Sequence, residues 1–172
     1  MAIPNKWVIA PPRKALVVGV ADMVSSNDST AELVTYSLGS CLGIAIYDAF
    51  AKVGGLLHVM LPDSKIDSAK AASSPYMFVD SGVPRLFQAV YNLGGDRRRI
   101  TVKVAGGAQL LDPHRVFNIG ERNAQTFTEL LVRNGYTIHG RDVGGLASRT
   151  MRLDMTNGQV SIKSPGVDLY LI

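Results

Sequence analysis

The chain contains one cysteine, Cys41, which directly follows Gly39-Ser40, and a histidine, His58, which closely follows a pair of glycines. A thiol near its ordinary pKa of about 8.5 is only a few per cent ionised at neutral pH, and an adjacent imidazole can remove its proton. The imidazolium then stabilises the thiolate, which can attack a carbonyl carbon. The turn before Cys41 exposes the sulfur and presents backbone N–H groups, so Gly39, Ser40 and Gly43 are candidates to bind a developing oxyanion.

A predicted β-hairpin would bring Cys41 and His58 together. Two apolar runs separated by four residues are typical of such a hairpin. They cover residues 42–48 and 53–61. With Asp48 opposite Val53, the register places Gly43 opposite the histidine. Side chains alternate along a strand, so the thiol and the imidazole then share one face as diagonal neighbours, with Cβ atoms roughly 7–8 Å apart. An odd number of loop residues without a bulge would instead place them on opposite faces.

A base of this kind needs a third group that orients the imidazole. Thr35, Asp48 and Asp63 are all close in the sequence, and spacing alone does not choose among them. There is also a simpler interpretation, because a lone cysteine is more often a small core residue than a nucleophile. A redox-sensing thiol is a weaker alternative, since the chain has no second cysteine to resolve it.

Length and composition favour one folded domain. The chain has 172 residues, a formal net charge of +4 and 47% hydrophobic residues. We expect a single domain over residues 1–172, with an irregular arm at 1–14 and an apolar tail at 165–172. One cysteine excludes an internal disulfide framework. No apolar run approaches the roughly 20 residues of a membrane span, so we expect a cytoplasmic protein without membrane insertion.

Several other function classes lack their motifs. The sequence has no G-x-x-x-x-G-K-[ST] loop and no G-x-G-x-x-G opening a helix, which argues against a nucleotide cofactor. Its three histidines are far apart, and it has no H-x-x-x-H or C-x-x-C pair, so we predict neither a metal site nor a cofactor. The basic run Arg97-Arg98-Arg99 has no interleaved aromatic residues, and we therefore expect no nucleic-acid partner.

The remaining patterns predict an α+β fold. Apolar spacing predicts two helices, over residues 81–93 and 118–134. Asn118 and Glu121 form a capping-box pattern at the start of the second helix. The polar stretch 62–78 is expected to be a long loop, a candidate for a lid or for contact with substrate. Alternation on both sides of Asn157-Gly158 predicts a hairpin with a type I′ turn. Two helices among about seven strands, with hairpins at both ends, favour α+β over a repeated βαβ winding.

Six segments of the sequence resemble the CheD-type chemoreceptor glutamine deamidases. They are TYSLGSCLG (35–43), GGLLHVMLP (54–62), DSGVP (80–84), AGGA (105–108), IGERN (119–123) and DVGG (142–145). The resemblance spans roughly residues 15–164, and six motifs in the same order make coincidence improbable.

This resemblance implies a cysteine hydrolase that converts selected receptor glutamines to glutamate in bacterial chemotaxis. It implies Cys41 as nucleophile, His58 as its base and Thr35 as the residue that completes the triad. The implied fold is a layered α/β sandwich with antiparallel or mixed sheets and two main helices, similar to bacterial toxin deamidases. The expected substrate is the cytoplasmic helix of a chemoreceptor, and family members can bind a CheC-type phosphatase. The alternative is a non-catalytic regulatory partner of that phosphatase or of the receptor.

Overall fold

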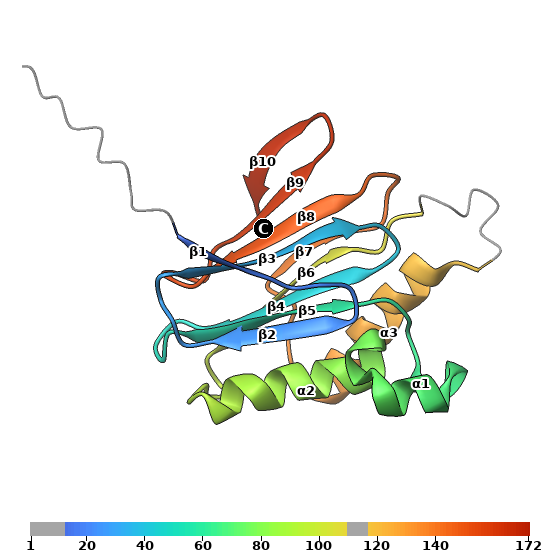
Figure 1. The fold of residues 1–172 in the computed structure, drawn as a ribbon, viewed down its shortest axis with the longest axis horizontal. Helices are drawn as coiled ribbons and strands as arrows, with labels where there is room; N and C mark the ends of the chain where they lie inside the picture. The colour runs from blue at the N-terminus through green and yellow to red at the C-terminus, as the bar shows by residue number, and fades with distance from the viewer. Residues whose placement is uncertain (1–12, 110–116) are drawn as a thin grey trace, which may run out of the picture.

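Two β-sheets and a layer of helices make up the fold, and the computed structural model describes residues 13–109 and 117–172 (Figure 1). The first sheet has the order β1-β3-β8-β9-β10, with β1 (Lys14–Val17), β3 (Ala31–Leu38), β8 (Arg149–Asp154), β9 (Val160–Ser164) and β10 (Val167–Leu171). The second has the order β2-β5-β4-β6-β7, with β2 (Asp22–Ser26), β5 (Val53–Val59), β4 (Leu42–Asp48), β6 (Ile100–Gly106) and β7 (Gly140–Val143). The helices lie on the side of the second sheet away from the first; they are α1 (Ser68–Ser73), α2 (Val79–Asn92) and α3 (Ile119–Arg133). This arrangement confirms the predicted α+β sandwich with two main helices.

Two apolar cores hold the three layers together. One lies between the second sheet and the helices and includes Ile44 and Leu86. The other lies between the two sheets and includes Ala45 and Met151. Consecutive residues of β4 therefore point into different cores, because side chains alternate along a strand that is buried on both faces. This is why β4 is apolar along nearly its whole length.

The hairpin of β4 and β5 has the register predicted from the sequence. Asp48 lies opposite Val53, and Gly43 lies opposite His58. A Cβ added to Gly43 would lie 2.8 Å from Cδ1 of Leu38 in the first sheet. The face of the hairpin that carries Gly43 and His58 is therefore the one that packs against the first sheet.

The prediction of a long polar loop at 62–78 is wrong. This stretch folds into two short 3-10 helices, η1 (Ser64–Ile66) and η2 (Pro75–Met77), with α1 between them. Asp67 caps α1 by accepting a hydrogen bond from the N–H of Lys70 at 2.8 Å. The alanines that follow favour a helix, so the cap and their propensity outweigh the polar composition of the stretch.

The predicted capping box at Asn118 and the predicted type I′ turn at Asn157-Gly158 are also wrong. Asn118 has a φ of 50° and makes no side-chain cap, and its Oδ1 instead accepts a hydrogen bond from Gln109 at 2.9 Å. In the hairpin of β8 and β9, Gly158 has a positive φ and Asn157 does not. A type I′ turn requires a positive φ at both central residues. The hydrogen bond from the Gly158 N–H to the Asp154 carbonyl, at 2.8 Å, shows a longer loop.

The two ends of the chain differ from a simple arm and tail. Residues 1–12 of the predicted arm lie outside the described residues, whereas Lys14 already begins β1. The apolar tail forms β10, which pairs with β9 at one edge of the first sheet. Its Tyr170 donates a hydrogen bond to Asp142 at 2.5 Å. The tail therefore extends a sheet.

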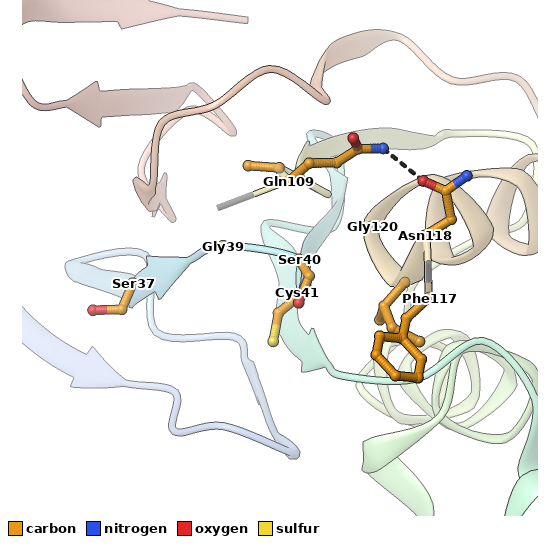
Figure 2. A pocket seen from close by; sticks show the side chains of 10 residues that line it. Ser37, Gly39, Ser40, Cys41, Gln109, Phe117, Asn118 and Gly120 are labelled. Atoms are coloured by element: carbon orange, nitrogen blue, oxygen red, sulfur yellow. Dashed lines mark hydrogen bonds between the residues drawn. The ribbon is translucent and has the colours of Figure 1, made fainter. Parts of the chain in front are cut away.

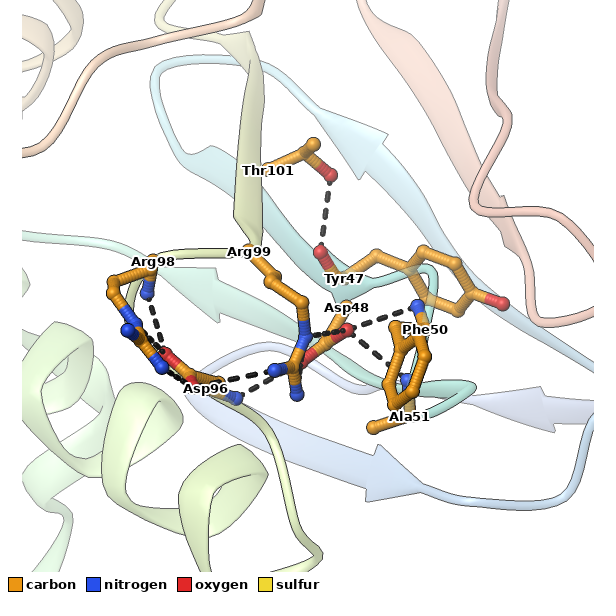
Figure 3. A network of polar contacts seen from close by, with 8 residues as sticks. All are labelled: Tyr47, Asp48, Phe50, Ala51, Asp96, Arg98, Arg99 and Thr101. Carbon is orange, nitrogen blue, oxygen red and sulfur yellow. Dashed lines mark hydrogen bonds and ion pairs between the residues drawn. The ribbon is translucent and has the colours of Figure 1, made fainter.

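Asp48, at the end of β4, is a fully buried carboxylate that organises the β4–β5 turn (Figure 3). It accepts hydrogen bonds from the backbone N–H groups of Phe50 and Ala51 at 3.0 and 3.1 Å. It also accepts one from the N–H of Asp96 at 2.9 Å and pairs with Arg99 at 2.8 Å. Burial raises the pKa of this carboxyl, but Arg99 and the three N–H donors outweigh burial and hold the pKa at about 2.

Replacing Asp48 with asparagine is expected to lower the free energy of unfolding by about 2 kcal/mol at pH 7, because Arg99 loses its charged partner. The folded-state pKa lies below the ordinary 3.8, so this stabilisation is fully present above that pH and is lost as the pH falls towards 2. Urea unfolding at pH 7 and at pH 3 measures the difference. A deficit of equal size at both pH values would contradict the assignment.

Candidate active site

Cys41 lies in the short connection between β3 and β4, and β3 contains a bulge near its end. The pairing of β3 with β8 shifts register between Thr35 and Leu38, and Ser37 between them has a φ of 57°. Residues three apart in a regular strand face opposite ways, but a bulge adds one residue and turns the strand. Thr35 and Leu38 are consequently both buried, and the chain then crosses to β4 with Cys41 half-buried.

The hydrogen bonds of Thr35 determine which nitrogen of His58 carries the proton. Thr35 Oγ1 lies 2.9 Å from the carbonyl oxygen of Val18 and 2.7 Å from Nδ1 of His58. A hydroxyl has one proton, which Thr35 donates to the carbonyl, so Thr35 accepts the second bond from the imidazole Nδ1–H. The neutral ring then has an unprotonated Nε2. Within the described residues this buried Nε2 has no hydrogen-bond partner, and it is therefore able to accept a proton.

Cys41 lies on the same side of the second sheet as His58. Cys41 packs against the apolar core between the sheets. His58 crosses the same space to reach Thr35 in the first sheet. The predicted sharing of one face is confirmed by these contacts, although Cys41 itself lies just outside the paired residues of the hairpin, which begin with Leu42 opposite Val59.

The other two candidates for the orienting group lie elsewhere. Asp48 is at the opposite end of β4 from Cys41, where it binds the β4–β5 turn and Arg99. Asp63 caps η1 by accepting a hydrogen bond from the N–H of Lys65 at 2.8 Å. Of the three alternatives that the spacing leaves open, Thr35 is the one in contact with the imidazole.

Burial sets the protonation states of the thiol and the imidazole. His58 is 1% exposed, and desolvation lowers the pKa of its imidazole from 6.5 to about 4. Burial also raises the pKa of the Cys41 thiol, an effect that its own backbone N–H partly offsets. The resting pair is therefore a neutral imidazole and a protonated thiol, so any reaction of the thiolate would first need a proton transfer from Cys41.

A cavity of about 390 Å³ opens beside Cys41 (Figure 2). Its wall comes from the end of β3 and the β3–β4 connection, from the segment after β6, and from the residues at the start of α3. The lining residues are Ser37, Gly39, Ser40, Cys41, Ala108, Gln109, Phe117, Asn118, Ile119 and Gly120. Figure 2 shows Ser40 and Cys41 on one side and Phe117 on the other, with Gln109 and Asn118 joined by a hydrogen bond. The volume is within the range of small-molecule sites, so a side chain of a substrate can enter.

The backbone N–H groups around Cys41 differ in their availability. The N–H of Gly39 donates to the Ser37 carbonyl at 2.9 Å. Gly43 lies inside β4, paired with β5 and β6, and does not line the cavity. Among the residues that the structure describes, neither the Ser40 N–H nor the Cys41 N–H donates to another residue. The geometry thus favours Ser40 and Cys41 over Gly39 and Gly43 as oxyanion donors.

Glycines allow β6 and α3 to approach the Cys41 turn closely. A Cβ on Gly106, which has a φ of 113°, would clash with the carbonyl oxygen of Cys41. A Cβ on Gly120 would clash with the carbonyl oxygen of Gly107. Without these side chains the Gly107 N–H reaches the Cys41 carbonyl at 2.8 Å, which fixes the start of β4.

Two further findings concern metals and membranes. Within residues 13–109 and 117–172, no three His, Cys, Asp or Glu side chains converge as a metal ion would require. None of the helices in that same part of the chain combines the length and the apolarity needed to cross a membrane.

Comparison with known proteins identifies the family. A family model described as "CheD chemotactic sensory transduction" matches residues 60–164, more than half of the 172 residues. The chain belongs to the CheD family. The family resemblance found in the sequence is thus confirmed. The matched segment begins just after His58, so it covers part of the cavity wall but none of the residues Thr35, Cys41 and His58.

Curated CheD proteins are similar along most of the chain. "Probable chemoreceptor glutamine deamidase CheD 1" of Syntrophus aciditrophicus (strain SB) is 46% identical over 151 residues, 88% of this chain and 94% of the relative. "Probable chemoreceptor glutamine deamidase CheD" of Solibacter usitatus (strain Ellin6076) is 43% identical over 157 residues, 91% of this chain and 93% of the relative. The protein of that name from Desulforamulus reducens is 41% identical over 167 residues, 95% of this chain and 99% of the relative.

The CheD site also contains a residue to which sequence reasoning assigned no role. Asn123 lies on α3 with no exposed surface, and its side chain contacts the segments that carry Cys41 and His58. The available signal was its place on the helix, four residues before Phe127 on the face that is otherwise apolar. A polar side chain at such a position needs buried hydrogen-bond partners.

Proposed function

We propose that the chain is a protein-glutamine deamidase that converts specific chemoreceptor glutamines to glutamate, as a single cytoplasmic domain acting in bacterial chemotaxis. The names of the CheD relatives support the substrate and the reaction. The observation that carries the proposal is the hydrogen bond between Thr35 and Nδ1 of His58, at 2.7 Å, which leaves Nε2 free on the face that Cys41 shares.

The proposed reaction proceeds through a thioester. Sγ of Cys41 attacks the carboxamide carbon of the glutamine side chain while Nε2 of His58 takes the thiol proton. The tetrahedral intermediate collapses when His58 returns that proton to the nitrogen, and ammonia leaves. His58 then takes a proton from water, and the hydroxide attacks the thioester carbon. Loss of the thiolate, which recovers its proton from His58, releases glutamate and restores the resting pair.

The oxyanion of each tetrahedral intermediate is proposed to bind the backbone N–H groups of Ser40 and Cys41. Both residues line the cavity, and neither N–H has an acceptor in another described residue. Donors that are fixed before the reaction stabilise developing charge without reorganising. Phe117, 69% exposed on the opposite wall, offers apolar surface to the receptor helix that presents the glutamine.

The test is to incubate the protein with the cytoplasmic fragment of a chemoreceptor and to read amide-to-acid conversion at each glutamine by mass spectrometry. Conversion confined to a few glutamines, with one ammonia released per glutamate formed, is the expected result. Protein alkylated by iodoacetamide serves as the control and should be inactive. Stable binding of the fragment without conversion would instead favour the regulatory role. A pull-down with a CheC-type phosphatase tests the partner that the proposal includes.

Replacing Thr35 with valine is expected to lower kcat by about 100-fold, because the isosteric side chain no longer accepts the Nδ1–H and the imidazole tautomer is no longer fixed. Thr35→Ser retains the hydroxyl and should keep most of the activity. Steady-state measurement of ammonia release gives kcat and KM for both variants. Equal kcat values for the valine and serine variants would contradict an orienting role for the hydroxyl.

A further inference from the structure

Asn123 is a fully buried polar residue on the inner face of α3, which otherwise consists of Gly120, Phe127 and Leu131. Helices bury asparagine at a cost, because its amide loses hydrogen bonds to water unless the protein replaces them. The partners of this amide therefore indicate what the residue does.

Both amide protons of Asn123 are used at the candidate active site. Nδ2 donates to the carbonyl oxygen of Ser40 and to that of Met60, each at 2.9 Å. Ser40 directly precedes Cys41, and Met60 follows His58 by two residues. Among the described residues, Oδ1 has no hydrogen-bond partner, so the orientation of the amide is set by what it donates. One side chain thus ties together the segments that carry the thiol and the imidazole.

The bond to Ser40 belongs to a series of three. The carbonyl of Gly39 accepts from the N–H of Ala108 at 2.7 Å, and that of Cys41 accepts from the N–H of Gly107 at 2.8 Å. The carbonyl between them, that of Ser40, is the one held by Asn123. Two of the three donors are backbone groups, and the third is a side chain, which substitution can remove.

Holding a carbonyl also aims the N–H of the next residue. A trans peptide is planar, and its N–H points away from its C=O. When the Ser40 carbonyl is held towards α3, the N–H of Cys41 therefore points away from α3, in the same peptide plane. Without the bond from Asn123, the plane between Ser40 and Cys41 can rotate between its neighbours.

We propose that Asn123 is a positioning residue that holds the Ser40–Cys41 peptide so that the Cys41 N–H binds the oxyanion. This inference rests on the proposed amide hydrolysis at Cys41, and it adds a residue outside the triad to that reaction. Asn123 does not touch the substrate. It acts by fixing the donor before the reaction begins, which is the condition under which such donors are effective.

The test compares two reactions of the same thiol. Amide hydrolysis passes through an oxyanion, whereas alkylation by iodoacetamide is a displacement at carbon and forms none. Asn123→Leu, which is similar in size and has no donor, should lower kcat by about 100-fold, the usual effect of losing one oxyanion donor. KM and the rate of Cys41 alkylation should stay within about threefold of the parent, because binding and proton transfer to His58 do not use this peptide.

A matched control separates this role from packing. Phe127→Leu changes a buried side chain one turn further along the same face of α3, away from Ser40, and should leave kcat unchanged once both variants are compared as folded protein. If Asn123→Leu does not fold, Asn123→Ser is measured in its place, with the same large loss of kcat expected. Melting curves confirm that each variant is folded at the assay temperature.

Each outcome decides a different question. A parallel loss of alkylation and turnover, or no greater loss of kcat than in Phe127→Leu, would overturn the positioning role and leave the deamidase proposal intact. Turnover that survives in Cys41→Ala, or a parent protein that makes no glutamate, would overturn the proposed function and this inference with it. A selective loss of kcat supports both.

Discussion

Replacing Cys41 with alanine should abolish glutamate formation, with a loss of about 10⁴-fold or more in kcat. Cys41 is the one cysteine of the chain and borders the cavity, so its removal leaves no thiol for the proposed thioester. The half-buried side chain is small, so the fold should be retained. Ammonia release under saturating receptor fragment, with circular dichroism to confirm folding, measures the effect.

The serine variant is the sharper control for Cys41. Cys41→Ser keeps the size of the side chain and offers a hydroxyl to His58, but a hydroxyl has a much higher pKa than a thiol and is a poorer nucleophile here. We expect turnover near that of the alanine variant. Activity within tenfold of the parent in the alanine variant would exclude a thioester and require another nucleophile, whereas such activity in the serine variant alone would contradict the expected need for a thiol.

The hairpin shows what a sequence determines well. Two apolar runs and a loop of four residues fixed the pairing of Asp48 with Val53, and the alternation of strand side chains then placed Gly43 opposite His58. Such inferences succeed because period and loop length are local properties. The same logic placed both main helices to within a few residues.

The features that were missed depend on contacts between distant segments. Spacing could not choose Thr35 over Asp48, because the choice depends on a bulge in β3 and on the packing of one sheet against the other. Asn118 fits a capping box, yet a tertiary bond from Gln109 takes its side-chain oxygen. Asn123 lies within one of the family motifs, but the sequence alone assigns it no role. Its hydrogen-bond partners are the carbonyls of Ser40 and Met60, which are 83 and 63 residues away along the chain.

Replacing His58 with asparagine should lower kcat at pH 7 by about 10³-fold, because the buried thiol of Cys41 loses its base and departing ammonia loses its acid. The two proteins should also differ in pH dependence. In the parent, the rate should stay nearly constant from pH 8 down to about 5 and fall only as Nε2 gains a proton near the pKa of about 4. In the variant, the rate should rise about tenfold per pH unit through neutrality, since only ionised thiol reacts. Identical profiles would exclude His58 as the base.

The same substitution should remove a pH dependence of stability. His58 titrates near 6.5 in the unfolded chain and near 4 in the folded protein, so between these pH values the unfolded state binds the extra proton. The parent is therefore expected to lose about 3 kcal/mol of unfolding free energy relative to His58→Asn as the pH falls from 7 to 4. Urea titrations of both proteins across this range measure it. A constant difference would mean that the imidazole has the same pKa in the folded and unfolded states, which would contradict the lowered pKa assigned to His58.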